Sequence, residues 1–158
     1  MNYGYLCNEI QHFSAMAKIT VQNTQITVLQ WAEQDYISLT DMASAKEGDS
    51  RSADIIKNWI RNRYTIEFLG TWEVIHNPNF KVVEFDHFRK SAGLPSFVLS
   101  ASEWIECTSA IGLVVKKGRY GGTYAHKDIA FEFGSAISVP FKLYLIEEFQ
   151  RLKTEEVR

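Results

Sequence analysis

The sequence predicts one α+β domain in which an N-terminal β-hairpin, a pair of helices and a second, glycine-rich hairpin follow one another along the chain. Three patterns support this prediction. Apolar and polar residues alternate near the N-terminus, apolar stripes recur at helical spacing in the middle and at the end, and glycines gather between two short strand-like runs. The length of 158 residues suits one domain, and no linker or repeat divides it.

The domain is expected to occupy residues 16–158, with residues 1–15 as an extension before it. Residues 1–15 have neither the basic start nor the apolar stretch of a signal peptide. Met16 is followed by Ala17 and Lys18 and offers an alternative start of translation. We therefore treat residues 1–15 as a segment that need not belong to the native protein.

The first elements are expected to be strands. Residues 18–22 and 25–29 alternate β-branched with polar side chains, and Asn23-Thr24 between them predicts a hairpin turn. Residues 36–38 have the composition of a third strand. The chain should therefore begin with a small antiparallel sheet.

A short helix is expected next, over residues 41–46. Thr40 has a side chain suited to cap it, and Asp41 places a negative charge in its first turn, where the helix dipole favours one. The glycine, aspartate and serine at positions 48–50 would end it.

A second helix is predicted from Ser52 to Arg63. Its inward face is an apolar stripe of Ile55, Ile56, Trp59 and Ile60. The remaining face carries Lys57, Asn58, Arg61 and Asn62. A further helix over residues 65–75 would turn inward Phe68, Leu69, Trp72 and Ile75. Two helices joined around residues 63–65 predict an arrangement like a helix-turn-helix.

Residues 79–99 give the weakest pattern. Residues 82–85 are compatible with a strand or with the beginning of a helix. After this region, Ser100 and Glu103 have the spacing of a capping box, which predicts a helix through Thr108. Gly112 is expected to close that helix.

The second hairpin is predicted from residues 113–117 and 123–125, with a glycine-rich tip at residues 118–122. A helix should begin at His126 or Lys127 and bury Ile129, Ala130 and Phe133. A last helix should begin at Pro140 and bury Phe141, Leu145, Phe149 and Leu152.

The charge distribution predicts one basic face on a slightly acidic molecule. The net charge is −2, which argues against binding of nucleic acid by bulk charge alone. Residues 51–63 carry four basic residues and one acid, and residues 115–127 carry four basic residues and no acid. The C-terminal region compensates with Glu147, Glu148, Glu155 and Glu156.

Three segments resemble the KilA-N domain, a DNA-binding module of phages, large DNA viruses and bacteria that is related to the APSES domain of fungal transcription factors. They are Tyr-Ile-Ser-Leu-Thr-Asp-Met-Ala at 36–43, Trp-Ile-Glu-Cys-Thr-Ser-Ala-Ile-Gly-Leu at 104–113, and Gly-Arg-Tyr-Gly-Gly-Thr-Tyr-Ala-His-Lys-Asp-Ile-Ala at 118–130. The resemblance spans residues 18–153. It implies a small winged-helix-like fold in which the helix pair and the hairpin, as a wing, approach a duplex together.

One departure limits what the resemblance carries over. Fungal members often continue the glycine-rich hairpin with Trp-Val-Pro, where this chain has Tyr124, Ala125 and His126. Contacts known from that branch therefore transfer poorly to this sequence.

The second helix and the wing supply the residues expected to contact double-stranded DNA. Lysine and arginine neutralise phosphates, and glycines let the backbone approach a groove closely. Asparagine can read adenine and arginine can read guanine. The side chain of Tyr120 suits either stacking on a sugar or covering the hairpin. The expected contacts are Lys57, Asn58, Arg61, Asn62, Arg63, Lys116, Lys117, Arg119, Tyr120, Gly121, Gly122, Thr123 and Lys127.

No catalytic, metal-binding or cofactor-binding pattern is recognised, so we expect a protein that is not an enzyme. His126 and Asp128 are two positions apart and would not share a face within a helix. His76, Asp86 and His87 lack the spacing of a ligand set. The glycine-rich hairpin lacks the Gly-Lys-Ser/Thr of a nucleotide-binding loop.

The alternative is a protein-interaction module of a phage or defence system that does not touch DNA. The last helix carries Leu143, Tyr144 and Phe149 around more than one face, so it offers a surface for a homodimer. Cys7 and Cys107 form no disulfide or zinc pattern, and Cys107 is expected to be buried and inert. A cytoplasmic location without a membrane span is expected on these grounds.

Overall fold

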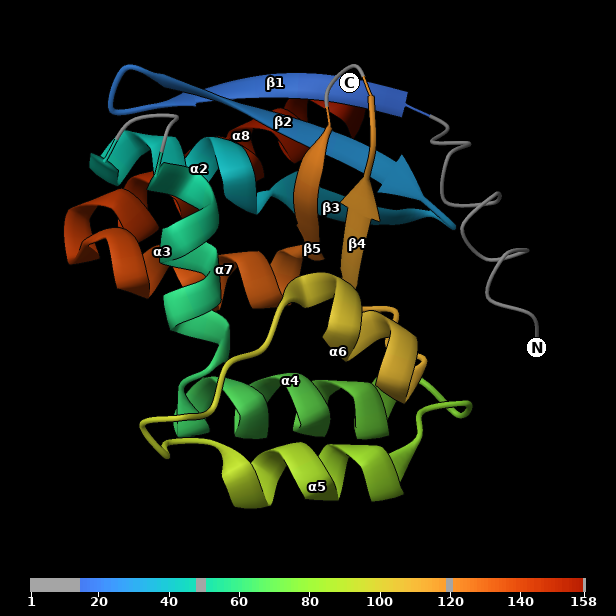
Figure 1. Ribbon diagram of the computed structural model, residues 1–158. Coiled ribbons are helices and arrows are strands. Elements are labelled where there is room, and N and C mark those ends of the chain that lie inside the picture. The colour runs from blue at the N-terminus through green and yellow to red at the C-terminus, as the bar shows by residue number, and fades with distance from the viewer. Residues whose placement is uncertain (1–14, 48–50, 119–120, 158) are drawn as a thin grey trace.

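Five antiparallel strands form one sheet in the computed structural model, which describes residues 15–47, 51–118 and 121–157 (Figure 1). Both predicted hairpins are confirmed, and the third strand pairs with one strand of the second hairpin, with Ile37 opposite Ala125. Because of this pairing, the second hairpin belongs to the main sheet. In the sheet order β1-β2-β3-β5-β4, the strands are β1 (Ala15–Val21), β2 (Thr24–Trp31), β3 (Gln34–Ser38), β5 (Gly122–His126) and β4 (Leu113–Lys116).

The turn between β1 and β2 lies at Gln22 and Asn23, one residue before the predicted position. Both residues have positive φ angles, 48° and 68°. Two successive left-handed residues match the twist of the flanking strands in a two-residue hairpin. The same conformation recurs at Ala32 and Glu33 between β2 and β3, with φ angles of 51° and 64°.

Helix α2 (Leu39–Glu47) begins two residues before the predicted range. Its cap is Ser38, whose Oγ accepts a hydrogen bond of 3.0 Å from the backbone N–H of Asp41. The prediction of Thr40 as the cap was wrong, because a suitable hydroxyl precedes it by two residues. Thr40 lies in the first turn of the helix, and its Oγ1 is available to accept a hydrogen bond from another element. The predicted stop at residues 48–50 lies outside the described residues.

Helices α3 (Ser52–Ile60) and α4 (Arg63–His76) form the predicted helix pair. The predicted extension of α3 to Arg63 was wrong, since Arg63 is the first residue of α4. The chain turns at Asn62, whose backbone is extended, with φ −71° and ψ 138°. No glycine or proline marks this break, so the helical spacing of the sequence continues across it.

The inner face of α4 differs from the predicted stripe. Leu69 and Trp72 are buried as expected and Phe68 is half-buried, but Ile75 is 69% exposed, so its predicted inward position was wrong. Glu73 lies inside instead and is only 1% exposed. An apolar pattern does not reveal such a residue, because a buried carboxylate depends on hydrogen-bond donors from elsewhere in the chain.

Residues 79–99 contain helix α5 (Val82–Ser91), which settles the open choice between strand and helix. Helix α6 (Ala101–Thr108) starts as predicted, because the Oγ of Ser100 accepts a hydrogen bond of 3.1 Å from the backbone N–H of Glu103. It ends at Ser109, which has a positive φ of 60°. The prediction that Gly112 closes this helix was therefore wrong.

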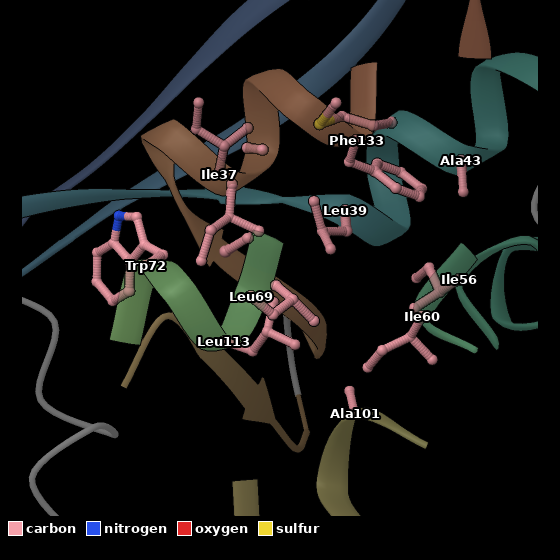
Figure 2. Close-up of a cluster of buried hydrophobic side chains, with 14 of the residues drawn as sticks. Ile37, Leu39, Ala43, Ile56, Ile60, Leu69, Trp72, Ala101, Leu113 and Phe133 are labelled. Atoms are coloured by element: carbon pink, nitrogen blue, oxygen red, sulfur yellow. The ribbon is translucent and has the colours of Figure 1, made fainter. Parts of the chain in front are cut away.

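The predicted helices α7 (Lys127–Ile137) and α8 (Val139–Val157) complete the fold. Helices α2, α7 and α8 pack on the sheet, whereas α4 and α5 lie side by side at the end of the molecule far from β1 (Figure 1). Figure 2 shows the core between these layers, where Ile37 of β3, Leu69 of α4 and Phe133 of α7 belong to one apolar cluster. Within the described ranges, no helix has both the length and the apolar character to cross a membrane.

Candidate nucleic-acid interface

A concave surface forms where α2, α3, the start of α6 and the β4–β5 hairpin meet, and we call it the hairpin groove. Five of its residues carry hydroxyl groups, and Lys57 adds a positive charge. None of its lining residues is acidic. The lining consists of Thr40, Ser52, Ala53, Ile56, Lys57, Ser100, Ala101, Ser102, Val115, Gly122 and Thr123.

A second concave surface, which we call the helix groove, lies between α3 and the segment that connects α5 to α6. Lys57 and Ser100 line both grooves, so the two surfaces adjoin. The helix groove has three basic residues but also two acids, so the basic face predicted from the sequence is mixed in charge here. Its lining consists of Arg51, Asp54, Lys57, Asn58, Arg61, Val98, Leu99, Ser100 and Glu103.

The polar face of α3 is presented to solvent as the sequence predicts. Lys57 and Asn58 are exposed, while Ile56 and Ile60 on the opposite face are buried. Arg61 is half-buried, and its Nη2 donates a hydrogen bond of 3.0 Å to the carbonyl oxygen of Pro95. This bond joins the end of α3 to the segment between α5 and α6.

The other two expected contacts of this region, Asn62 and Arg63, do not belong to α3. Asn62 is the exposed N-cap of α4, and Arg63 is exposed in its first turn. Asn62 also lines a shallow surface with Trp59 and Ala136, on the side of α3 that faces α7. Asn62 nevertheless adjoins the helix groove, because Arg51, Asp54 and Asn58 line both surfaces, whereas Arg63 lines neither.

The glycine-rich hairpin is docked on α2 by a close backbone approach. The backbone N–H of Thr123 donates a hydrogen bond of 3.0 Å to the Oγ1 of Thr40. Gly122 has a φ of 143°, and a Cβ there would lie only 2.6 Å from the same Oγ1. Only glycine fits this position, so Gly122 fixes the hairpin against the helix layer.

The expected wing residues separate into two groups. Lys117 and Gly121 are exposed near the tip and Lys116 is half-buried, whereas Arg119 and Tyr120 lie outside the described residues. Lys127 follows the other end of β5 and pairs with Asp128, with 3.1 Å between its Nζ and Oδ1. The structure therefore does not bring Lys127 together with the tip.

His126 and Asp128 lie close together, so the sequence-based argument for their separation was wrong. His126 precedes α7 as its N-cap, and its Nδ1 accepts a hydrogen bond of 3.2 Å from the backbone N–H of Asp128. Its Nε2 therefore carries the proton and donates to the Oε1 of Gln34 at 2.8 Å. Burial, as the largest cause, lowers the pKa of His126. Both ring nitrogens serve the fold, and the imidazole is buried.

Cys107 is half-buried, so the expectation of an enclosed cysteine was wrong. Burial and the neighbouring Glu103 raise the pKa of its thiol, which favours the less reactive protonated form. Among the described residues, no three His, Cys, Asp or Glu side chains lie together as a metal site would require. Two of the three residues considered in the sequence as metal ligands have other partners. Asp86 pairs with Lys90, and the Nδ1 of His87 lies 3.8 Å from the Oε2 of Glu84.

Sequence reasoning missed several residues of the two grooves. Thr40, Ser100 and Ser102 line the hairpin groove, and Val98 lines the helix groove. Thr40 and Ser100 stood out only as helix caps. A cap places backbone N–H groups and a hydroxyl at one surface, and that was the available signal for the hydroxyl groups of the hairpin groove.

The fold and its grooves define a class, the small α+β domain with an open surface shared by α3, the start of α6 and a glycine-rich hairpin. The family assignment is consistent with this class. The KilA-N domain family matches residues 19–155, nearly the whole chain, and the chain belongs to this family, whose members are generally DNA-binding domains. Comparison with curated proteins found no match, and neither did comparison with solved structures.

Proposed function

We propose that the chain binds double-stranded DNA through the hairpin groove and the exposed face of α3, as a phage-related or bacterial regulator of transcription. The observation that carries this proposal is the position of Lys57. It lines both grooves, so the basic helix and the glycine-rich hairpin share one surface. The proposed activity is binding alone, without a chemical step.

The hairpin groove has chemistry suited to a DNA phosphate. Helices α3 and α6 both begin at this groove, at Ser52 and Ala101, and helix N-termini present backbone N–H groups and partial positive charge. The hydroxyl groups of the lining can donate hydrogen bonds to phosphate oxygens, and Lys57 adds a full charge. The groove therefore suits positioning of the duplex.

The exposed face of α3 has chemistry suited to base edges. Asn58 is exposed and can pair with adenine in the major groove. Arg61 uses one N–H group for Pro95, and a guanidinium has five, so it retains donors for a guanine. The bond to Pro95 also limits the directions in which Arg61 can extend, which favours a fixed contact.

A salt titration tests the proposal. Lys57→Ala should weaken binding to a mixed-sequence duplex and reduce the magnitude of the salt slope by roughly 0.9, because one phosphate contact is lost. Lys90→Ala is the matched control, since Lys90 is an exposed lysine of α5 outside both grooves. Fluorescence polarisation from low to high salt measures both. Equal slopes for the two variants, or no binding by the wild-type chain at low salt, would reject this interface.

A second candidate is a protein-interaction surface on α8, including a homodimer. Leu143 is 57% exposed and Tyr144 is 51% exposed, which favours it. Phe149 is only 6% exposed, so its expected part in that surface was wrong. Sedimentation of the wild-type chain and of Tyr144→Ala at low and high salt tests this candidate. Self-association through an apolar interface should depend little on salt and should be lost in the variant, whereas phosphate binding depends steeply on salt.

A further inference from the structure

We propose that Glu73 is a positioning residue that fixes the orientation of the glycine-rich hairpin relative to the helix pair. The inference rests on the proposed function, in which the hairpin and α3 contact the same duplex. Glu73 lies in α4, the helix that directly follows α3. Its side chain reaches Ile111 and Gly112, the two residues that precede β4, and we call these two residues the hairpin root.

The carboxylate of Glu73 accepts three hydrogen bonds. Its Oε1 accepts from the backbone N–H of Ile111 at 2.9 Å and from the Nδ2 of Asn77 at 2.9 Å. Its Oε2 accepts from the backbone N–H of Gly112 at 2.7 Å. Bonds of this kind to an ionised acceptor are about twice as strong as neutral ones. Two successive N–H groups of the root are therefore held by one side chain of α4.

The carbonyl groups of the hairpin root are held from the opposite side. The hydroxyl of Tyr36 in β3 donates a hydrogen bond of 2.8 Å to the carbonyl oxygen of Ile111. The backbone N–H of His126 in β5 donates a hydrogen bond of 2.8 Å to the carbonyl oxygen of Gly112. All four backbone polar groups of the root are thus engaged, two by the helix pair and two by the sheet.

The packing around Gly112 leaves little freedom for the root to shift. A Cβ at this position would lie 2.5 Å from the Cδ1 of Ile129, 2.8 Å from the Oε2 of Glu73 and 3.1 Å from the Cε3 of Trp72. The absence of a side chain lets the root approach α4 closely enough for both bonds to Glu73 to form. The root is therefore fixed by contact as well as by hydrogen bonds.

The cost of burying Glu73 indicates that stability alone is a poor explanation for it. Burial raises the pKa of this carboxyl, although its hydrogen bonds act in the opposite direction. A well-packed apolar side chain often serves stability as well as a buried charged group does or better. A carboxylate also fixes the orientation of its partners, because its two oxygens accept hydrogen bonds from two specified N–H groups.

Glu73→Gln tests the inference, because the amide keeps the shape but replaces one acceptor with an N–H₂ group. Glu67→Gln is the matched control, since Glu67 lies on the same helix and is 45% exposed near Arg89. We measure hydrogen exchange at the amides of Ile111 and Gly112, and the salt slope of binding to a mixed duplex at a temperature where circular dichroism shows folded protein. The control should match the wild type in both.

For Glu73→Gln, we expect faster hydrogen exchange at the amides of the root. We also expect the magnitude of the salt slope to fall by up to about 1.8, because Lys116 and Lys117 no longer contact DNA phosphates. A folded variant with faster exchange but unchanged affinity and slope would overturn the inference and leave Glu73 a purely stabilising role. If Glu73→Gln does not fold, Tyr36→Phe loosens the root from its other side and must give the same reduced slope. A wild-type chain that binds no duplex would overturn the proposed function itself.

Discussion

The two ends of the β4–β5 hairpin differ in how their backbone is held. At the root, every backbone polar group of Ile111 and Gly112 has a partner in a helix or in the sheet. Near the tip, the backbone N–H of Gly121 bonds to the carbonyl oxygen of Gly118 within the hairpin itself, Lys117 is exposed, and a Cβ added at Gly118 would meet nothing within 4 Å. We infer a division of roles, in which the buried end sets the direction of the hairpin and the exposed end displays charge.

The largest effect on stability is expected at the root. Gly112→Ala places a methyl group against Ile129, Glu73 and Trp72, and overpacking of this kind costs about 1–3 kcal/mol of the free energy of unfolding. Gly118→Ala at the tip is the comparison, since it has free space and only the strain of a φ of 82°, about 1 kcal/mol. Urea denaturation measures both. A loss at Gly118 equal to or above that at Gly112 would contradict the division.

A smaller, pH-dependent effect is expected at the side chain of His126, whose imidazole bonds to Gln34 and to the backbone of Asp128. Burial lowers the pKa of His126 below its ordinary value of 6.5, so the unfolded state takes up this proton more readily than the folded state. The contribution of His126 to stability is therefore present above pH 6.5 and is lost as the pH falls through the folded-state pKa.

The measurement compares urea denaturation at about pH 7.5 and 5.5. His126→Gln should flatten the pH dependence of the free energy of unfolding, and a variant that keeps the wild-type dependence would mean that His126 is not its source. The raised pKa of Glu73 changes the free energy of unfolding with pH in the opposite direction. The difference between the variant and the wild type removes this shared contribution and leaves that of His126.

The smallest effect on stability is expected near the tip. Replacing Lys116 and Lys117 together by Ala should change the free energy of unfolding by less than about 1 kcal/mol, because Lys117 is exposed and Lys116 is only half-buried. The same variant should reduce the magnitude of the salt slope of DNA binding by roughly 1.8. Thermal denaturation and polarisation titrations measure the two quantities. A destabilised variant with an unchanged slope would reverse the roles assigned to tip and root.

The parts of the fold that depend on local patterns could be predicted from the sequence. The β1–β2 hairpin follows from alternation, the inner face of α3 from helical spacing, and the start of α6 from the capping box at Ser100. The exposure of Lys57 and Asn58 followed from the same spacing. These features are determined by neighbours only a few residues apart.

The parts that the sequence did not predict depend on distant partners. Glu73 is buried because Ile111 and Gly112, which lie 38 and 39 residues later, donate to it. Thr40 belongs to the hairpin groove because Thr123 bonds to it from 83 residues away. No periodicity within one element encodes such pairs, so the grooves emerge only when the helices and the sheet are assembled.

The order of the sheet has a consequence for the behaviour of the protein at high concentration. β1 and β4 are its outer strands, and outer strands can pair with a strand of another molecule and begin aggregation. β4 has only four residues and ends with Lys116, and Lys117 follows it. Short length and lysine charge both oppose such pairing. The charges proposed to contact DNA therefore also oppose the pairing of another molecule at the β4 edge of the sheet.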